Sequence, residues 1–272
     1  MYILDLGYSY VIQAGTPRNK IQKILQLENK HYNYIFLGSS RTENHIDCEL
    51  IENLTGKSCI NFGISGGSIG DMLVIMQLAK FNKVSFDKIF LEVDYNYNSA
   101  GLSRNFKATL VPFANHSIVK EVIVKEDDYF LYNYVPFYRY MKNDKVVGFR
   151  EMYNSLMNNM PANNIDVGFS PKIGVGNKVN GNFPEKLNEE NKEISRLIEL
   201  QTNKRNIIFF TAPYCPLIKN RNIVNGLSSK LDNFYNYVSI FDENEEYYFN
   251  CGHLNFEGAQ KFTRILIRDL KL

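Results

Sequence analysis

The chain has 272 residues, of which 44% are hydrophobic and 22% are charged, as is ordinary for a globular protein. Its 31 basic and 29 acidic residues are spread along the sequence, so it lacks the basic stripe that tracks a nucleic acid backbone. No window approaches the roughly 18 uninterrupted apolar residues of a membrane span. We therefore expect no nucleic acid partner and no membrane span in this chain.

Short apolar runs alternate with helical patterns along the first third of the chain. Residues 21–30 have the periodicity of a short amphipathic helix, and the run 34–37 is typical of a buried strand. The pattern then repeats as helix, strand, helix and strand over 47–54, 58–62, 70–81 and 88–93. Strand, helix, strand is the parallel crossover unit, so these elements predict a parallel sheet.

The last third of the chain supplies the rest of the sheet. Residues 206–211 and 237–241 are the fourth and fifth strand candidates, and a closing amphipathic helix is expected from Phe256 to about Leu270. Five parallel strands with helices on both faces make a three-layer α/β/α sandwich, which is the predicted fold class.

More than a hundred residues, 95–205, separate the third and fourth predicted strands, which far exceeds an ordinary connection. The middle of this segment, 127–144, is rich in aromatic residues, and 158–184 reads as a loop. We predict one α/β domain over 1–272 with an inserted cap or lid region over 95–205 at the C-terminal rim of the sheet, where α/β ligand sites lie. The alternative is a decorative subdomain with its own small core.

The cysteines indicate no metal site. Cys48, Cys59, Cys215 and Cys251 show no Cys-x-x-Cys pair and no paired histidine spacing, so zinc is not expected and buried free thiols are the default. Cys215 and Cys251 could still approach one rim and form a disulfide if the domain is exported. The N-terminal residues show no signal peptide pattern, so we expect a cytoplasmic protein, or one whose longer native N-terminus is missing here.

Four short segments lie near the expected strand ends: GSSR from Gly38, NFGISGG from Asn61, EVDYN from Glu92 and NCGHLNFEGA from Asn250. An open parallel sheet places its ligand crevice at this edge. A serine hydroxyl becomes a nucleophile only with a base in hydrogen-bond reach, and the resulting oxyanion needs preorganised donors. Ser40 and His253 are of the types that this chemistry requires.

These segments resemble the blocks of the SGNH or GDSL-type hydrolases, which run in the same order along a flavodoxin-like five-stranded sheet. GSSR stands where the family has Gly-Asp-Ser, so the resemblance makes Ser40 the nucleophile and puts Ser39 at the Asp position. NFGISG is similar to the second block and implies that the N–H groups of Gly66 and Ser40 bind the oxyanion. HLNFEGAQKFT is similar to the last block and implies that His253 is the general base.

One departure from the family pattern is Asn250. The family has an Asp three residues before the catalytic histidine, and this chain has an asparagine there. An amide carries no charge to stabilise an imidazolium and could favour the wrong tautomer. The alternatives are a Ser-His dyad, or support from a backbone carbonyl, Asp242 or Glu246.

The other departure is Asp94, which stands where the family offers an asparagine amide to the oxyanion. An ionised carboxylate there would repel the developing negative charge. We predict that Arg41 pairs with Asp94 and restores the electrostatics of the site, or that Asn96 reaches in. Arg41, Asp94 and Asn96 are therefore candidate oxyanion or substrate-binding residues, beside Gly66.

The resemblance implies a serine esterase or O-acyltransferase that acts through an acyl-serine intermediate and needs no metal or organic cofactor. Variants with a GSS-type first block resemble proteins that modify cell-envelope polysaccharides, which implies a carbohydrate ester as substrate and a periplasmic or cell-surface location. The rival hypothesis is a domain that has kept the fold and lost turnover, and that binds carbohydrate or serves assembly. A nucleotide binder ranks last, because the GxGxxG spacing is missing after the first strand. The oligomeric state stays open.

Overall fold

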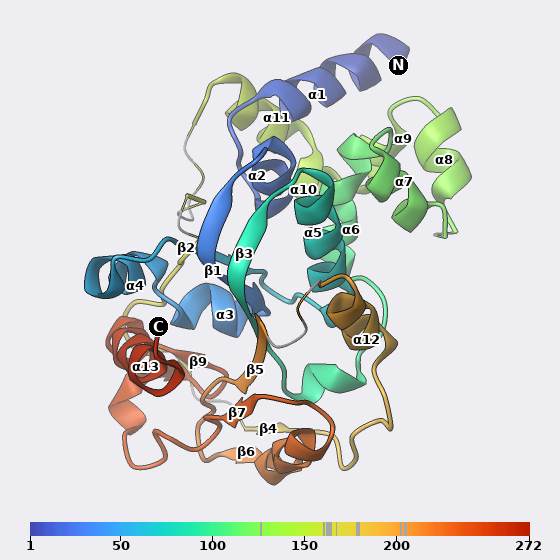
Figure 1. Ribbon diagram of the computed structural model, residues 1–272. Helices are drawn as coiled ribbons and strands as arrows, with labels where there is room; N and C mark the ends of the chain where they lie inside the picture. The colour runs from blue at the N-terminus through green and yellow to red at the C-terminus, as the bar shows by residue number, and fades with distance from the viewer. Residues whose placement is uncertain are drawn as a thin grey trace.

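The computed structural model describes residues 1–125, 127–159, 161, 165–166, 168–177, 180–201, 203 and 206–272. Its central sheet has five parallel strands in the order β2-β1-β3-β5-β7, namely β1 (His31–Gly38), β2 (Cys59–Gly63), β3 (Ser85–Glu92), β5 (Ile207–Thr211) and β7 (Phe234–Asn236). Helices flank the sheet on both faces (Figure 1). The predicted three-layer α/β fold is confirmed, and the strand order is the flavodoxin-like one.

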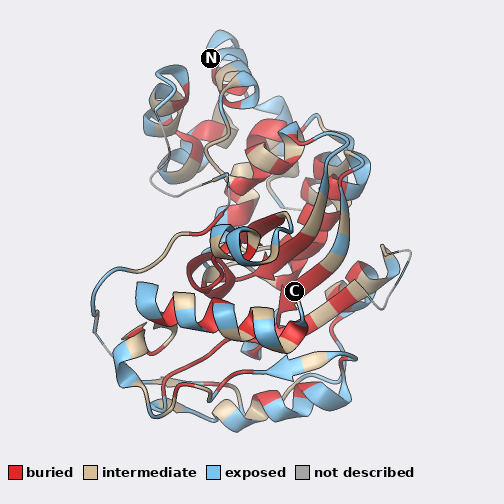
Figure 2. Cartoon of the chain, turned by 60° about the vertical axis from the view of Figure 1, so that its left-hand side comes forward, coloured by how far each residue is buried: buried red, intermediate tan, exposed pale blue. Residues whose placement is uncertain are grey.

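Successive side chains along each strand point to opposite faces of the sheet, so a hydrophobic core forms on each face. Ile35 and Leu37 of β1 point into the core that includes α2 (Lys20–Gln26), α5 (Ile69–Phe81) and α12 (Lys192–Glu199). Tyr34 and Phe36 point into the other core, with α4 (Cys48–Thr55) and α13 (Phe256–Leu270). The strands are buried between these layers, as Figure 2 shows in red. Burial on both faces explains why the strands read as continuous apolar runs.

Some predicted boundaries are wrong. The last strand is Phe234–Asn236, whereas 238–243 form turns. Tyr237, directly before these turns, and Phe241, within them, are both buried, so the apolar run reflects burial without a strand. Helix α2 ends at Gln26, before residue 30, because the chain turns extended at Leu27. The sequence patterns did not indicate the N-terminal helix α1 (Tyr2–Ala14).

The first half of the predicted insertion is helical. It contains η1 (Tyr95–Asn98), α6 (Arg104–Leu110), η2 (Val111–Phe113), α7 (Ser117–Ile123), α8 (Tyr129–Tyr134), α9 (Tyr138–Lys142), α10 (Asp144–Val147) and α11 (Phe149–Leu156). In this part α11 packs against α1, and α7 packs against α5. Helices α7, α8 and α9 lie with α1 at the N-terminal end of the molecule (Figure 1).

The second half of the insertion contacts α3 and a short strand that follows β5. Ser170 N–H donates to the Glu43 carbonyl at 2.9 Å, and β4 (Gly181–Asn182) pairs with β6 (Ile218–Lys219). Residues 126, 160, 162–164, 167, 178–179, 202 and 204–205 of the predicted insertion and loop lie outside the described residues. The insertion therefore contacts the helices α1, α5 and α3 and the short strand β6, and its role as a cap stays a prediction.

Two disulfides join segments that lie apart in sequence. Cys48 at the start of α4 is bonded to Cys59 at the start of β2, and Cys215 after β5 is bonded to Cys251. The expectation of free buried thiols is wrong for both pairs, because packing of α4 on β2 and convergence of two loops bring the sulfurs together. Among the described residues, no helix is long and apolar enough to cross a membrane.

The remaining elements are short. They are α3 (Ser40–His45), η4 (Arg221–Ser229), η5 (Glu245–Tyr247), β8 (Tyr248–Asn250) and β9 (His253–Leu254). Strands β8 and β9 form an antiparallel hairpin ahead of α13. This hairpin and α3 carry the residues that sequence analysis selected at the two ends of the chain.

Candidate active site

The turn after β1 is shaped by two glycines that pair across the strand ends, Gly38 of β1 and Gly63 of β2. A Cβ on Gly63 would lie 2.3 Å from the Glu43 nitrogen, and one on Gly38 would lie 2.2 Å from Thr42 Oγ1. Only glycine leaves room for α3 to start directly on the ends of the strands. Ser40 is the first residue of this helix.

A buried carboxylate holds that turn in place. Ser39 N–H and Ser39 Oγ both donate to Glu92 Oε2 at 2.8 Å, and Ser39 Oγ also accepts from the Arg41 N–H at 3.3 Å as the N-cap of α3. Glu92 is the last residue of β3 and is fully buried. The side chain of Ser39 is therefore occupied, and Ser40 presents the available hydroxyl.

Ser40 and His253 meet, although 213 residues separate them in sequence. Ser40 Oγ lies 2.8 Å from His253 Nε2, and Ser40 is half-buried. The other ring nitrogen, Nδ1, lies 3.0 Å from Asn250 Oδ1. The structure thus brings the predicted nucleophile, base and third residue into one row.

The orientation of the Asn250 amide fixes the histidine tautomer. Asn250 Oδ1 also accepts from the Gly252 N–H at 3.0 Å, and since a backbone N–H can only donate, the amide oxygen must face this side. Nδ1 of His253 then carries the proton, and the lone pair of Nε2 faces Ser40. The amide oxygen of Asn250 thus favours the tautomer that a general base needs, whereas the sequence had raised the possibility that an amide favours the wrong one.

The two acids that were alternatives to Asn250 are engaged elsewhere. Asp242 forms a bidentate ion pair with Arg221 at 2.7 and 2.8 Å, and Glu246 accepts from Asn244 at 3.2 Å. Asn250 is therefore the side chain that orients His253.

Burial lowers the pKa of His253 to about 4, and the positive charges of Arg41 and Lys172 act in the same direction. The imidazole is consequently neutral at pH 7 and can accept a proton from Ser40. Its position is held from both sides: Cys251 is bonded to Cys215, and the Leu254 N–H donates to His45 Nε2 at 2.9 Å.

The loop that contains Gly66 is attached to the same edge. Ile64 N–H donates to the Gly38 carbonyl at 2.9 Å, and Ser65 Oγ donates to Glu43 Oε2 at 2.5 Å. Gly66 has φ of 70°, in a turn closed by the Gly67 N–H on the Ile64 carbonyl at 2.7 Å, which favours glycine. Among the described residues, no acceptor lies within hydrogen-bond reach of the N–H groups of Gly66 and Ser40, so both remain candidate oxyanion donors.

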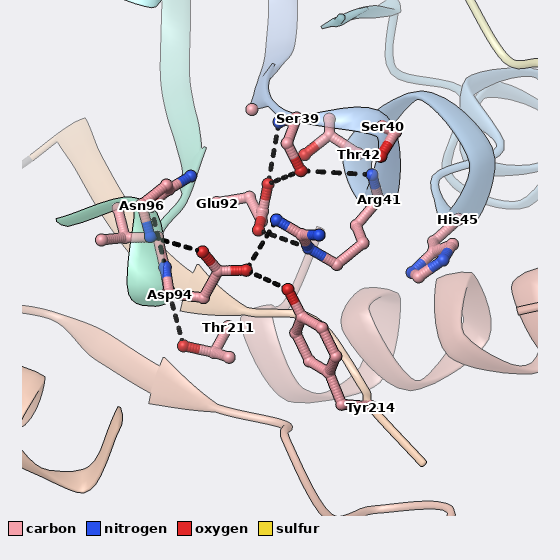
Figure 3. Close-up of polar contacts among 12 residues, drawn as sticks. Ser39, Ser40, Arg41, Thr42, His45, Glu92, Asp94, Asn96, Thr211 and Tyr214 are labelled. Carbon is pink, nitrogen blue, oxygen red and sulfur yellow. Dashed lines mark hydrogen bonds and ion pairs between the residues drawn. The ribbon is translucent and has the colours of Figure 1, made fainter. Parts of the chain in front are cut away.

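Arg41 points away from solvent into a buried ion cluster, shown in Figure 3. Its Nε lies 3.0 Å from Glu92 Oε1, and its Nη2 lies 2.7 Å from Asp94 Oδ2. Tyr214 donates its hydroxyl to Asp94 Oδ2, and its ring lies 4.9 Å from the guanidinium carbon. The predicted contact between Arg41 and Asp94 is therefore present, and an oxyanion role for either residue stays a prediction.

Asn96 does not reach toward Ser40 through any contact of the described residues. Its Oδ1 accepts from the Asp94 N–H at 3.1 Å, and its own N–H donates to Asp94 Oδ1 at 2.8 Å. Asn96 thus closes the turn after β3 and holds Asp94 in its orientation.

The two carboxylates of the cluster differ in their affinity for protons. Burial raises the pKa of Asp94 to about 7; Arg41 opposes this shift and Glu92 adds to it. Burial also acts to raise the pKa of Glu92, but Arg41 and the donors of Ser39 outweigh it, so that this pKa is lowered. The positive charge of Arg41 therefore balances the negative charge of Glu92, which stays ionised, whereas Asp94 titrates near neutral pH.

Sequence analysis did not select Glu92 or Tyr214 for the site. An acidic residue within the apolar run KIFLEV was the available signal for Glu92, since a charge on a buried strand needs a partner. Tyr214 had no such signal among the many tyrosines. Among the described residues, no group of three or more His, Cys, Asp or Glu side chains could hold a metal ion.

The fold and this geometry define an α/β protein with a serine-histidine pair at the edge of a parallel sheet. No known family description and no curated protein matches the chain. One similar solved structure is a protein from Streptococcus pneumonia that is provisionally described as a platelet activating factor. It has 16% sequence identity and a TM-score of 0.45, over 98% of this chain and 95% of that chain. A likeness this low carries no argument about function.

Proposed function

We propose that the protein is an SGNH-type serine esterase, or an O-acyltransferase that uses the same serine. The observation that supports this proposal best is the distance of 2.8 Å between Ser40 Oγ and His253 Nε2, with Nδ1 held by Asn250. A nucleophile, a base and a residue that orients the base are the parts that acyl transfer requires.

In the proposed reaction, His253 Nε2 removes the proton of Ser40 as Oγ attacks the acyl carbon. The tetrahedral oxyanion accepts hydrogen bonds from the N–H groups of Ser40 and Gly66. The C–O bond of the ester then breaks, and the leaving alcohol takes the proton from the imidazolium. Water or an acceptor hydroxyl next gives its proton to His253 and attacks the acyl-serine. The bond between the acyl carbon and Ser40 Oγ then breaks, and Ser40 takes the proton back from the imidazolium.

The proposed substrate is an acyl ester of a carbohydrate, and the proposed location is the periplasm or the cell surface. The substrate class is what the resemblance of the first block, GSSR from Gly38, to GSS-type variants of the family implies. The two disulfides support the location, because disulfides persist in oxidising compartments and are rare in the cytosol.

A fluorophosphonate probe and p-nitrophenyl acetate test the proposal. We expect the probe to label Ser40 covalently and the acetate to be hydrolysed, with both signals lost in Ser40→Ala. Ser228→Ala, which removes an exposed hydroxyl on η4, is the matched control. A well-folded protein that the probe does not label and that binds glycans would instead support the rival, a carbohydrate-binding or assembly domain without turnover.

The pH dependence of the reaction should report the low pKa of His253. The base acts only when deprotonated, so kcat/KM should be flat from about pH 8 to pH 5 and fall at lower pH with a midpoint of about 4, against about 6.5 for an ordinary histidine. Circular dichroism at each pH separates this titration from acid unfolding. A midpoint near 6.5 would contradict the buried, neutral imidazole.

Exchanging Asn250 for aspartate should increase turnover. A carboxylate keeps the Nδ1–H tautomer and adds a negative charge that stabilises the imidazolium, so we expect a higher pKa of His253 and an increase in kcat of about tenfold to hundredfold. Asn250→Ala should lower kcat, since it removes the acceptor that orients the ring. Titration of the His253 ring by NMR, together with steady-state kinetics, measures both effects.

A further inference from the structure

A cavity of about 560 Å³ adjoins the elements that carry Ser40 and Gly66. Glu43 and Ser65 are part of its wall. Glu43 follows Ser40 by three residues on α3, which makes the two neighbours on one helix, and Ser65 directly precedes Gly66. The volume is in the range of small-molecule sites.

The charges that line this cavity are unbalanced. Of the described residues, Arg18, Lys20, Lys145 and Arg150 line its wall, against a single acid, Glu43. Two of these cations are neutralised within the protein. Lys20 Nζ lies 3.8 Å from Glu43 Oε1 and donates to the carbonyls of Gly63 and Gly168, and Arg18 Nε lies 2.6 Å from Glu151 Oε1.

Lys145 of α10 and Arg150 of α11 are not neutralised in this way. Both are exposed, and neither forms an ion pair within the part of the chain that the structure describes. The polar contact of the Arg150 side chain is with the Lys145 carbonyl, at 3.5 Å. The wall also contains the apolar side chains of Ile64, Phe106 and Val146, together with Asn105 and Thr109.

We propose that this cavity binds the acidic part of the substrate, a phosphate or carboxylate group on an otherwise uncharged or apolar body. The anion contacts Lys145 and Arg150, the body lies against Ile64 and Phe106, and the ester extends past Ser65 to Ser40. Glu43 does not repel the anion strongly, because Lys20 and Ser65 already engage its carboxylate. This inference rests on the proposed function and narrows its substrate to acidic esters.

Isothermal titration calorimetry with phenyl phosphate, benzoate and benzyl alcohol tests the inference. We expect both anions to bind and the neutral alcohol to bind at least about tenfold more weakly, because charge-assisted contacts are the stronger ones. Lys145→Ala/Arg150→Ala should weaken binding of both anions by about tenfold or more, and added salt should weaken it further. The matched control is Lys261→Ala/Arg264→Ala, which removes two exposed cations from α13.

Repeating the calorimetric titrations on Ser40→Ala tests anion binding in the cavity separately from the proposed ester chemistry, since this variant can bind the anions without turnover. Equal affinity for anions and alcohol, or unchanged anion affinity in Lys145→Ala/Arg150→Ala, would overturn the cavity as an anion site. If phenyl phosphate binds but does not compete with p-nitrophenyl acetate in an active protein, the cavity is not part of the substrate site. If no ester is cleaved while the anions bind as expected, the proposed function fails and the anion site stands.

Discussion

Replacing His253 by glutamine should lower the kcat for p-nitrophenyl acetate by about 10⁴-fold or more, the usual result when one member of a catalytic unit is removed. Glutamine keeps a polar side chain of similar reach toward Ser40 Oγ, but an amide cannot take up the proton that the serine must lose. The contact at 2.8 Å with Ser40 would thus be retained in part without general base catalysis.

The measurement compares steady-state kinetics of His253→Gln with those of His31→Gln, in which a half-exposed histidine at the start of β1 is replaced. His31→Gln should keep normal turnover. If His253→Gln retains turnover within about tenfold of the parent, the base is another group and the proposed mechanism is wrong.

The second large effect concerns stability. Replacing Arg41 by methionine should lower the free energy of unfolding by about 3–5 kcal/mol, the usual cost of removing one partner from a buried ion pair. Arg41 is 5% exposed, and Glu92 and Asp94 are both fully buried beside it. Without the guanidinium, Glu92 must either stay charged in an apolar surrounding or take up a proton, and both outcomes are unfavourable.

Urea unfolding followed by circular dichroism measures this loss, with Arg264→Met on the exposed face of α13 as the control. Asp94→Asn provides an internal comparison. The pKa of Asp94 is higher in the folded state, about 7, than in the unfolded state, so the folded parent loses stability as pH rises through this interval. Asp94→Asn has no such titration and should therefore become more stable relative to the parent over the same interval. A loss of under about 1 kcal/mol in Arg41→Met would show that the cluster does not depend on its cation.

The layered fold could be predicted because its signals are local. Each strand of the sheet, apart from the last, contains a short apolar stretch, and the alternating helices supply the crossovers. The last strand was misplaced because Tyr237, before a turn, and Phe241, within it, are both buried, and burial alone does not distinguish a turn from a strand. The Cys48–Cys59 bond gave no signal, since it depends on how α4 packs on β2.

The candidate site was predictable only where a motif marked it. The order of the segments at Gly38, Asn61 and Asn250 indicated that Ser40 and His253 would meet, and the structure brings them together. In the ion cluster, the pairing of Arg41 with Asp94 was predicted and is present, whereas no motif marked Glu92 and Tyr214 as their partners. The tautomer of His253 likewise depends on an amide orientation that only the Gly252 N–H fixes.

Helix α3 has six residues, with Ser40 at its first position and His45 at its last. Because His45 Nε2 accepts from the Leu254 N–H, the backbone next to His253 is tied to the same helix that presents the hydroxyl. A small rigid displacement of α3 during thermal motion would therefore move Ser40 and the backbone beside His253 together and leave their separation nearly unchanged. The alignment of the pair is thereby set by about two turns of helix, which are themselves anchored to β3 through Ser39 and Glu92.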